Sequence, residues 1–159
     1  MNKKILLGAG FIVAIILVVG VFSKEKDAGL MPVAQAHEAT VYREATCGCC
    51  RAYLVYLKKE GFNVIDNVVD SIGAIKDEYG VHVDMQSCHT TIIDGYVVEG
   101  HMPIGAIEKL LSEKPAINGI ALPGMPSGSP GMPGAKRGAF EIHGLMEESG
   151  QAQMMFMSL

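Results

Sequence analysis

The sequence predicts an α/β domain whose elements follow the order βαβαββα, between an N-terminal apolar helix and a C-terminal extension rich in Gly, Pro and Met. Short apolar runs of strand length alternate with stretches of helical periodicity, and the dipeptide Asp94-Gly95 separates two of these runs as a hairpin turn would. Three cysteines stand within the four residues 47–50, at the junction between the first predicted strand and the first predicted helix. That junction is where chemistry is expected.

The first 36 residues are typical of an export signal or a membrane anchor. Lys3 and Lys4 precede 18 apolar or glycine residues over 5–22, which is long enough to cross the hydrocarbon layer of a bilayer. The triplet Ala34-Gln35-Ala36 has the small-x-small form of a cleavage site, although it lies well beyond the apolar run. We favour an uncleaved inner-membrane anchor and keep a cleaved signal as the alternative. Both place the rest of the chain in the periplasm or another extracytoplasmic space.

Residues 37–159 have the length of one domain, with a core over about 39–114, a Gly/Met/Pro loop over 115–134 and a tail over 135–159. They carry nine basic and fifteen acidic side chains, a formal net charge of −6 against −4 for the whole chain. The sequence offers no basic patch to neutralise phosphates, so nucleic acid is excluded as a partner and cationic partners fit better.

The first half of the core predicts two strands and two helices. A strand over 39–43 leads into a helix over 49–60, in which apolar residues recur at helical spacing and a glycine follows as the stop signal. A second strand spans 62–69. The short helix that follows, over 71–79, is expected to begin with a serine as its N-cap, Ser71.

The second half of the core predicts a hairpin and a helix. Strands over 90–93 and 96–99 flank Asp94-Gly95, which supplies the positive φ angles of a tight turn. A helix over about 103–113 follows, opened by one proline and stopped by another.

This element order is that of thioredoxin-like domains, in which a thiol loop follows the first strand and opens the first helix. Cys47 and Cys50 form a C-x-x-C at that place. In such folds the turn before the final hairpin, normally a cis-proline turn, approaches the active-site cysteines. Here that turn contains Cys88 and His89. We therefore expect Cys88 to join Cys47, Cys49 and Cys50, although almost forty residues separate them in the sequence.

Both soft-metal binding and thiol redox chemistry suit this cluster. A helix N-terminus lowers the pKa of cysteines in its first turn, and thiolates are both nucleophiles and soft metal ligands. A pair of structural disulfides explains the cysteines poorly, because Cys49 and Cys50 are adjacent and three of the four thiols share one turn. Cu(I) binding and disulfide exchange remain open, and Zn²⁺ on four thiolates is a less favoured alternative.

Histidine and methionine side chains supply further candidate ligands. His101, Met102, Met125 and Met132 follow the hairpin or lie in the Gly/Met/Pro loop. Thioether sulfur is a soft ligand that suits Cu(I) and offers little to zinc, so these methionines favour copper. For Met125 and Met132, packing that closes a lid over the site is an equal alternative. The methionines near the C-terminus are expected to pack in the core, namely Met154, Met155 and Met157.

Four motifs occur together and in order: Thr46-Cys-Gly-Cys-Cys50, Ser87-Cys-His-Thr90, Gly95-Tyr-Val-Val-Glu-Gly-His-Met-Pro103 and Gly124-Met-Pro-Ser-Gly-Ser-Pro-Gly-Met132. Together they resemble the CopG-type periplasmic copper-resistance proteins, a family long known as a domain of unknown function. The resemblance implies a thioredoxin-like fold that binds copper through its cysteines, with a role in copper handling or copper redox conversion. The metal ligands it implies are Cys47, Cys49, Cys50 and Cys88, with His89, His101 and Met102 nearby. The long apolar run and the Met-rich end, 151–159, depart from the family's pattern.

These observations predict an exported copper-binding protein that holds Cu(I) on clustered cysteines for copper resistance or homeostasis, with or without copper redox activity. The alternative is a thiol-disulfide oxidoreductase with Cys47 and Cys50 as its catalytic pair. Whether the protein is an enzyme stays open at this point, and metal binding is the favoured interpretation. The expected partners are copper ions, other periplasmic copper-handling proteins and, if the N-terminal helix is retained, the membrane.

Overall fold

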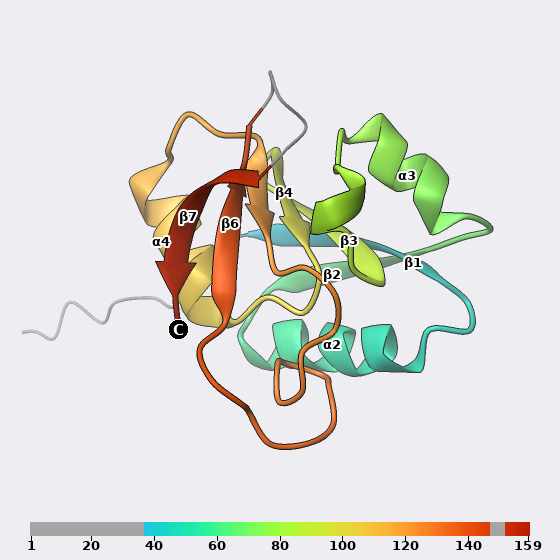
Figure 1. The fold of residues 1–159 in the computed structure, drawn as a ribbon. Helices are drawn as coiled ribbons and strands as arrows, with labels where there is room; N and C mark the ends of the chain where they lie inside the picture. The colour runs from blue at the N-terminus through green and yellow to red at the C-terminus, as the bar shows by residue number, and fades with distance from the viewer. Residues whose placement is uncertain (1–36, 147–151) are drawn as a thin grey trace, which may run out of the picture. The chain divides into compact units, whose positions relative to one another are not determined.

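Seven strands form one mixed sheet in the part of the chain that the computed structural model describes, residues 37–146 and 152–159. In chain order the elements are β1 (Glu38–Glu44), α2 (Gly48–Lys59), β2 (Asn63–Val69), α3 (Ile72–Glu78), the 3-10 turn η2 (Val83–Met85), β3 (His89–Ile93), β4 (Tyr96–Glu99), α4 (Ile104–Glu113), β5 (Gly119–Ala121), β6 (Glu141–Leu145) and β7 (Ala152–Ser158). The strand order across the sheet is β2-β1-β3-β4-β5-β6-β7 (Figure 1).

The elements from β1 to α4 confirm the predicted order βαβαββα, with η2 as a small addition. Strands β1 and β2 run parallel, with α2 as the connection between them, and β3 runs antiparallel to β1. Asp94 and Gly95 join β3 to β4 with φ angles of 49° and 83°. Both angles are positive, as the favoured two-residue hairpin turn requires.

Three strands lie beyond the predicted elements. β5 falls in the segment predicted as a loop, 115–134, and β6 and β7 fall in the predicted tail, 135–159. β5 has only three residues, too few for periodicity to reveal, and it forms because it pairs in parallel with β4 and antiparallel with β6. The sheet therefore continues for three strands beyond the last predicted helix.

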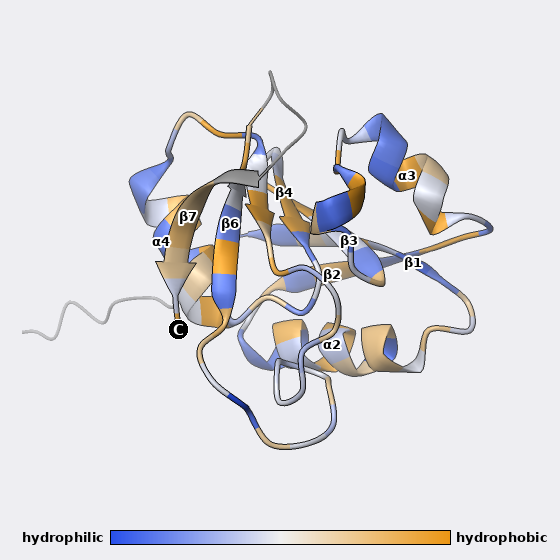
Figure 2. Cartoon of the chain, in the orientation of Figure 1, coloured by the Kyte–Doolittle hydropathy of each residue, from blue (hydrophilic) through white to orange (hydrophobic). Residues whose placement is uncertain are grey.

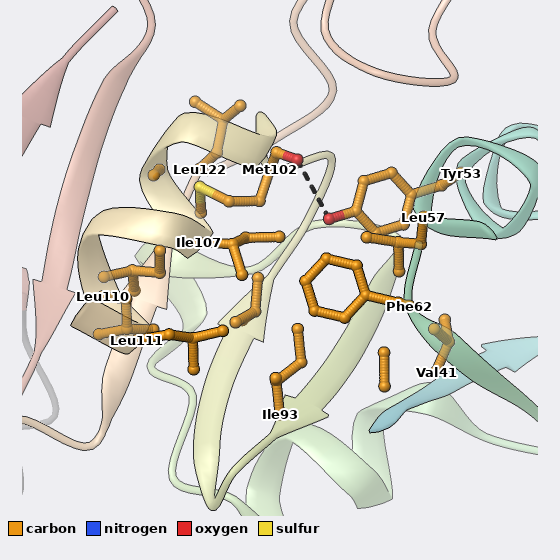
Figure 3. Packing of buried hydrophobic residues seen from close by; sticks show 14 of the residues in the cluster. Val41, Tyr53, Leu57, Phe62, Ile93, Met102, Ile107, Leu110, Leu111 and Leu122 are labelled. Atoms are coloured by element: carbon orange, nitrogen blue, oxygen red, sulfur yellow. Dashed lines mark hydrogen bonds between the residues drawn. The ribbon is translucent and has the colours of Figure 1, made fainter. Parts of the chain in front are cut away.

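Side chains alternate between two faces of the sheet, and different elements cover each face. Val98 belongs to the larger hydrophobic cluster, where Leu57 of α2 and Ile107 of α4 pack against the strands (Figure 3). Its neighbour Val97 belongs to a smaller cluster on the other face, against which residues around α3 and η2 pack, including Tyr79. The sheet is thus sandwiched between α2 with α4 on one side and α3 with η2 on the other.

Strand β7 is the outer strand at one edge of the described sheet, and Figure 2 shows it as mostly apolar. Met157 packs against the larger hydrophobic cluster, which confirms the prediction for this residue. The prediction that Met154 and Met155 pack in the core is wrong, because these residues are 49% and 50% exposed. An edge strand has a neighbour on one side only, so less of its side-chain surface is covered.

Helix α3 begins without the predicted serine cap. Ser71 occupies the N-cap position, but its side chain makes no capping hydrogen bond. The Glu44 carboxylate, at the end of β1, accepts a hydrogen bond from the Ile72 N–H instead, at 3.3 Å. A carboxylate at this place satisfies a free N–H of the first turn and also complements the helix dipole. The cap therefore comes from a neighbouring strand, which local sequence could not indicate.

The predicted N-terminal anchor or signal, residues 1–36, lies outside the described residues. Within the described ranges, no helix combines the length and the apolar character that crossing a membrane requires. The prediction of export therefore rests on the sequence alone.

The first testable prediction concerns the close approach of β5 to β4. A Cβ atom added to Gly119 would lie 1.9 Å from the backbone oxygen of Val97, which cannot move without breaking the pairing of these strands. We expect Gly119→Ala to lower the free energy of unfolding by about 1–3 kcal/mol, as overpacking typically does. Gly105→Ala is the matched control: its Cβ meets nothing within 4 Å, and alanine should stabilise α4 by about 0.5–1 kcal/mol. Urea unfolding measures both, and equal midpoints for the two variants would contradict the argument.

Candidate metal centre

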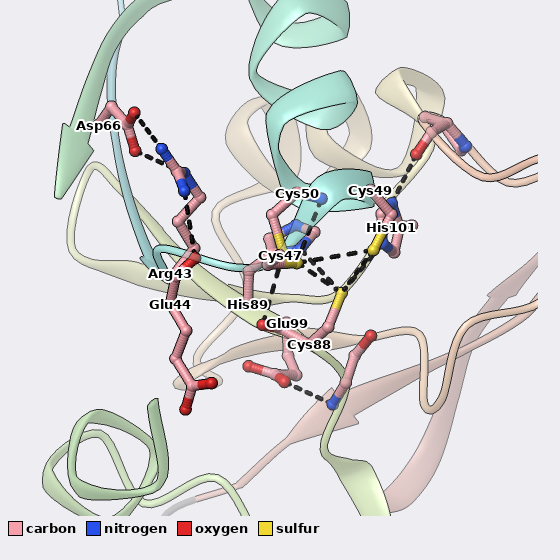
Figure 4. Close-up of a disulfide and its surroundings, with 12 residues drawn as sticks. Arg43, Glu44, Cys47, Cys49, Cys50, Asp66, Cys88, His89, Glu99 and His101 are labelled. Carbon is pink, nitrogen blue, oxygen red and sulfur yellow. Dashed lines mark hydrogen bonds and ion pairs between the residues drawn. A yellow bond between two sulfur atoms is a disulfide. The ribbon is translucent and has the colours of Figure 1, made fainter. Parts of the chain in front are cut away.

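Four cysteine sulfurs converge where β1 ends, α2 begins and β3 begins. Cys47 is the N-cap residue of α2, Cys49 and Cys50 lie in its first turn, and Cys88 immediately precedes β3. The Sγ atom of Cys49 lies 3.6 Å from that of Cys47 and 3.6 Å from that of Cys88, and the Sγ atoms of Cys50 and Cys88 are also 3.6 Å apart (Figure 4). The predicted meeting of the remote Cys88 with the cysteine triplet is confirmed.

Two of the four cysteines are joined. Cys47 and Cys50 form a disulfide, while Cys49 and Cys88 are free thiols. Cys50 is buried and the other three are half-buried, so the cluster lies at the surface with one sulfur inside. The same four sulfurs can therefore exist as thiols, as a disulfide with two thiols, or as thiolate ligands after reduction.

Cys47 caps the first turn of α2 with its sulfur atom. The Cys50 N–H donates to the Cys47 Sγ atom at 3.3 Å, so a sulfur atom takes the place of the usual oxygen cap. The partial positive charge of a helix N-terminus stabilises a thiolate there once the disulfide is reduced. The local sequence thus places an N-capping sulfur where the helix N-terminus favours the thiolate, the form that binds a metal ion.

Two histidines complete a second ligand group around Cys88. The Cys88 Sγ atom lies 3.1 Å from Nε2 of His101 and 3.4 Å from Nδ1 of His89. Both imidazoles are fully buried, and their rings pack edge to face with centroids 4.7 Å apart. The Tyr53 ring packs against His89 from the α2 side, at 4.5 Å between centroids.

The orientation of His101 is fixed by the Gly/Met/Pro loop. Its Nδ1 atom lies 2.7 Å from the carbonyl oxygen of Pro130. Because a carbonyl only accepts, Nδ1 must carry the hydrogen, which leaves the Nε2 lone pair facing Cys88. A backbone carbonyl that holds one ring nitrogen while the other binds a metal is a common support for histidine ligands. The adjacent Gly131 packs so closely on α2 that a Cβ there would lie 2.8 Å from the Tyr53 nitrogen.

Burial keeps both histidines in the neutral form that can bind a metal. Burial lowers the pKa of His89 well below its ordinary value, and the nearby His101 and Lys76 lower it further. Burial also lowers the pKa of His101. Within the described residues, the His89 Nε2 atom is buried without a hydrogen-bond partner. A buried imidazole that has one unpartnered nitrogen and borders the thiol cluster through its other nitrogen, Nδ1, fits a metal-ligand role better than a purely structural one.

The Cys88 thiol is held in its protonated form. Burial raises its pKa to about 12, and the hydrogen bond with the Cys49 thiol adds to the shift. A metal ion must therefore displace this proton, so metal affinity at this site should depend on pH.

Comparisons with known proteins were consistent with this geometry. Residues 85–132 match the family model "Protein of unknown function, DUF411". A solved structure described as "Copper resistance protein copG- Form 2" is 42% identical, with a TM-score of 0.69, and the match covers 77% of this chain and 98% of that one. The Form 1 structure of the same description is 43% identical, with a TM-score of 0.68, over 77% of this chain and 96% of that one. No curated protein matches the chain.

This chain belongs to the CopG family. Its membership rests on identity above 40% over nearly the whole length of both solved structures. The family model spans the part of the site formed by Cys88, His89, His101 and the Gly/Met/Pro loop. Both solved structures are described as copper-resistance proteins, and in this CopG family member the four cysteine sulfurs form a group that could hold a metal ion.

The three methionines predicted as ligands differ in how deeply their side chains are buried. Met102 is fully buried in the larger hydrophobic cluster, and its carbonyl oxygen accepts a hydrogen bond from the Tyr53 hydroxyl at 3.1 Å (Figure 3). The Met102 thioether thus contributes to core packing, and its predicted ligand role stays a prediction. Met125 is 54% exposed and Met132 is half-buried, both on the loop that packs over α2. Their role as ligands stays a prediction.

Sequence reasoning missed a buried ion pair that supports the CopG family site. The Glu99 carboxylate accepts hydrogen bonds from the Ser87 N–H and the Thr90 hydroxyl, each at 2.6 Å, and pairs with the Lys76 ammonium. Glu99 and Lys76 are almost completely buried. Ser87 and Thr90 flank the two ligand candidates Cys88 and His89, so the carboxylate fixes both ends of their turn. The signal available was a charged residue in the otherwise apolar strand 96–99.

The second prediction tests this support. Glu99→Gln leaves the Lys76 charge buried without its partner, so we expect the free energy of unfolding to fall by about 3–5 kcal/mol. The exposed pair Lys109 and Glu113 provides the control, and Glu113→Gln should change stability by no more than about 0.5 kcal/mol. Lys76→Met combined with Glu99→Gln should recover part of the loss, because neither charge then remains. Urea unfolding measures the free energy of unfolding of each variant. Equal losses for Glu99→Gln and Glu113→Gln would exclude a supporting role for the Glu99 ion pair.

The third prediction follows from the raised pKa of Cys88. In a Cys49→Ser variant with the disulfide closed and no metal, Cys88 is the remaining free thiol. Because only the thiolate reacts with iodoacetamide, the alkylation rate of the folded protein should still be rising above about pH 10, since burial, the largest cause of the shift, remains. When the same variant is unfolded in urea, the alkylation rate should level off about one pH unit above the ordinary cysteine pKa of 9.0. A plateau near that pH in the folded protein would contradict the assignment.

Proposed function

We propose that this protein binds Cu(I) on the reduced cysteine cluster, with His89 and His101 as neighbouring ligands. The observation that carries the proposal is the convergence of four sulfurs and two neutral imidazoles from three separate elements. Two thiolates bound to one ion at about 2.3 Å in tetrahedral geometry are about 3.8 Å apart. The Sγ separations of 3.6 Å are close to that value, so little movement is needed to accept an ion.

The donor set favours copper over zinc. Thiolates and imidazoles bind both metals, but a cluster of close thiolates can bridge several Cu(I) ions, and the relatives are described as copper-resistance proteins. The methionines of the loop would add soft ligands that zinc does not need. Copper is the cargo in this proposal, in a role in copper resistance or homeostasis.

Reduction of the Cys47–Cys50 disulfide couples metal binding to redox state. Opening the disulfide supplies two thiolates at the helix N-terminus, and closing it removes them. We therefore propose that the protein alternates between a disulfide form and a copper-binding thiolate form. The apolar N-terminal run supports a location outside the cytoplasm, anchored to the inner membrane or secreted into the periplasm. An oxidising compartment of that kind makes such alternation meaningful.

A thiol-disulfide oxidoreductase is the second candidate. The disulfide stands at the N-terminus of the helix after β1, and the β2-β1-β3-β4 part of the sheet supports a thioredoxin-like fold. Against it, Cys88 and His89 occupy the turn that faces the disulfide, where oxidoreductases of that fold present a proline to their substrates. Cys49 would also compete in disulfide exchange.

The fourth prediction tests copper binding by competition with a Cu(I)-specific chelator under anaerobic conditions. Fully reduced protein should compete, and the Cys47→Ser, Cys49→Ser double variant should bind at least about 100-fold more weakly, a loss of about 2.7 kcal/mol. His101→Gln should also weaken binding, whereas His37→Gln, whose imidazole pairs with Asp94 away from the cluster, serves as the matched control.

Two results would count against the proposal. The double cysteine variant could bind Cu(I) as tightly as the parent protein, which would place copper elsewhere. Alternatively, metal-free protein could reduce insulin disulfides with sustained turnover, which would favour the oxidoreductase.

A further inference from the structure

Cys49 and Cys88 are the two thiols that the first disulfide leaves free. Their Sγ atoms are 3.6 Å apart, in the first turn of α2 and at the start of β3 (Figure 4). Copper binding explains why both thiols are present, but it gives no reason for them to stay reduced in an oxidising compartment.

We propose that Cys49 and Cys88 form a second disulfide, so that the cluster is a pair of dithiols with three oxidation states. The proposal rests on the function proposed above and adds a regulation of the same site. With no disulfide all four thiolates are available to Cu(I), with one disulfide two remain, and with two disulfides none remains.

The pairing follows from which sulfurs are still available. Cys88 lies equally close to the Sγ atoms of Cys49 and Cys50, but Cys50 is already joined to Cys47. Bonding of Cys88 to Cys50 would require opening the first disulfide, whereas bonding to Cys49 requires only two free thiols. The Sγ atoms must approach by about 1.5 Å to reach the disulfide bond length of about 2.05 Å, a distance that side-chain rotation can supply.

Both residues are held in place, so that encounter between them is frequent. The Cys49 carbonyl oxygen lies against Gly131, at 3.1 Å from the position of an added Cβ, which ties the first turn of α2 to the loop. Cys88 is flanked by Ser87 and Thr90, which the buried Glu99 carboxylate fixes. Two thiols held at contact distance have the high effective concentration that disulfide formation needs.

A low-molecular-weight disulfide such as oxidised glutathione supplies the oxidant, and the reaction balances in two exchanges. The Cys49 sulfur attacks one glutathione sulfur, the glutathione disulfide breaks, and one reduced glutathione leaves. The Cys88 thiol then gives up its proton, which ends on the departing glutathione, and its sulfur attacks the Cys49 sulfur, so that the mixed disulfide breaks and the second glutathione leaves. In total the protein loses two protons and two electrons, and the two glutathiones gain them as thiols.

The fifth prediction uses metal-free protein, oxidised glutathione and mapping of tryptic peptides by mass spectrometry after free thiols are blocked. Cleavage after the basic residues isolates peptide 44–51, which holds three cysteines, from peptide 77–109, which holds Cys88. The first disulfide lies inside peptide 44–51, so only a bond to Cys88 links the two peptides. Oxidised wild-type protein should yield the linked pair, and a reductant should release it.

Two double variants identify the partner of Cys88. Cys47→Ser with Cys50→Ser leaves Cys49 and Cys88 and should still form the linked peptides. Cys47→Ser with Cys49→Ser leaves Cys50 and Cys88, an equally close pair, and should form them more slowly than the first variant, because buried Cys50 is less accessible to glutathione. Equal or faster linkage through Cys50, or no linkage in oxidised wild-type protein, would overturn the proposal. If a variant fails to fold, the absence of linked peptides in oxidised wild-type protein still overturns the proposal.

Chelator competition separates this proposal from the function on which it rests. Doubly oxidised wild-type protein should bind Cu(I) at least about 100-fold more weakly than the reduced protein, and reduction should restore binding. Unchanged Cu(I) affinity after complete linkage would overturn the regulatory proposal while reduced protein still binds. Failure of the reduced protein to bind Cu(I), with the linked peptides present, would instead overturn the proposed function and leave the second dithiol standing.

Discussion

The buried carboxylate of Glu99 is the constraint on which the site depends. It lies at the end of β4 and accepts hydrogen bonds from Ser87 and Thr90 on either side of the Cys88-His89 turn. Lys76, from the helix on the other face of the sheet, balances its charge. A buried ion pair gives little net stability, because desolvation offsets most of the attraction, but removing one partner is costly. Its value here is positional: it fixes a short turn that no regular element would otherwise hold.

Strand register brings the two halves of the cysteine cluster to one place. In the pairing of β1 with β3, Arg43 lies opposite His89, so the end of β1 and the start of β3 are neighbours. The chain leaves β1 and starts α2 with Cys47 as the N-cap, only a few residues beyond Arg43. Arg43 itself is anchored by two hydrogen bonds to Asp66 on β2, which fixes the three strands against one another. The remote sulfur arrives because of sheet topology.

Most of the features that the sequence predicted correctly are those that local sequence patterns indicate. Alternating apolar runs, the Asp94-Gly95 turn and the thiol-rich helix start predicted the elements from β1 to α4, and the likeness of their order to thioredoxin-like domains predicted the convergence of Cys88 with the triplet. Strand β5 was not predicted, because three residues are too few to show periodicity and the strand is stabilised by its pairing alone. The ion pair between Glu99 and Lys76 was not predicted, because the two residues are distant in the sequence. The packing of Met102 in the larger hydrophobic cluster was not predicted, because a thioether that fills a core looks the same in a sequence as one that binds copper.

The same contacts that shape the site also decide which ions it can accept. Burial holds Cys88 protonated and both histidines neutral, so this ligand group carries no charge before a metal ion binds. A hard cation gains little from neutral sulfur and nitrogen donors, whereas a soft ion can displace the thiol proton and form strong bonds to the thiolate. The Pro130 carbonyl keeps the His101 lone pair aimed at Cys88, so one ligand is oriented before metal arrives. The proposed selectivity for soft ions therefore rests on burial as well as on the choice of ligands, because burial withholds charge until an ion able to displace a proton is present.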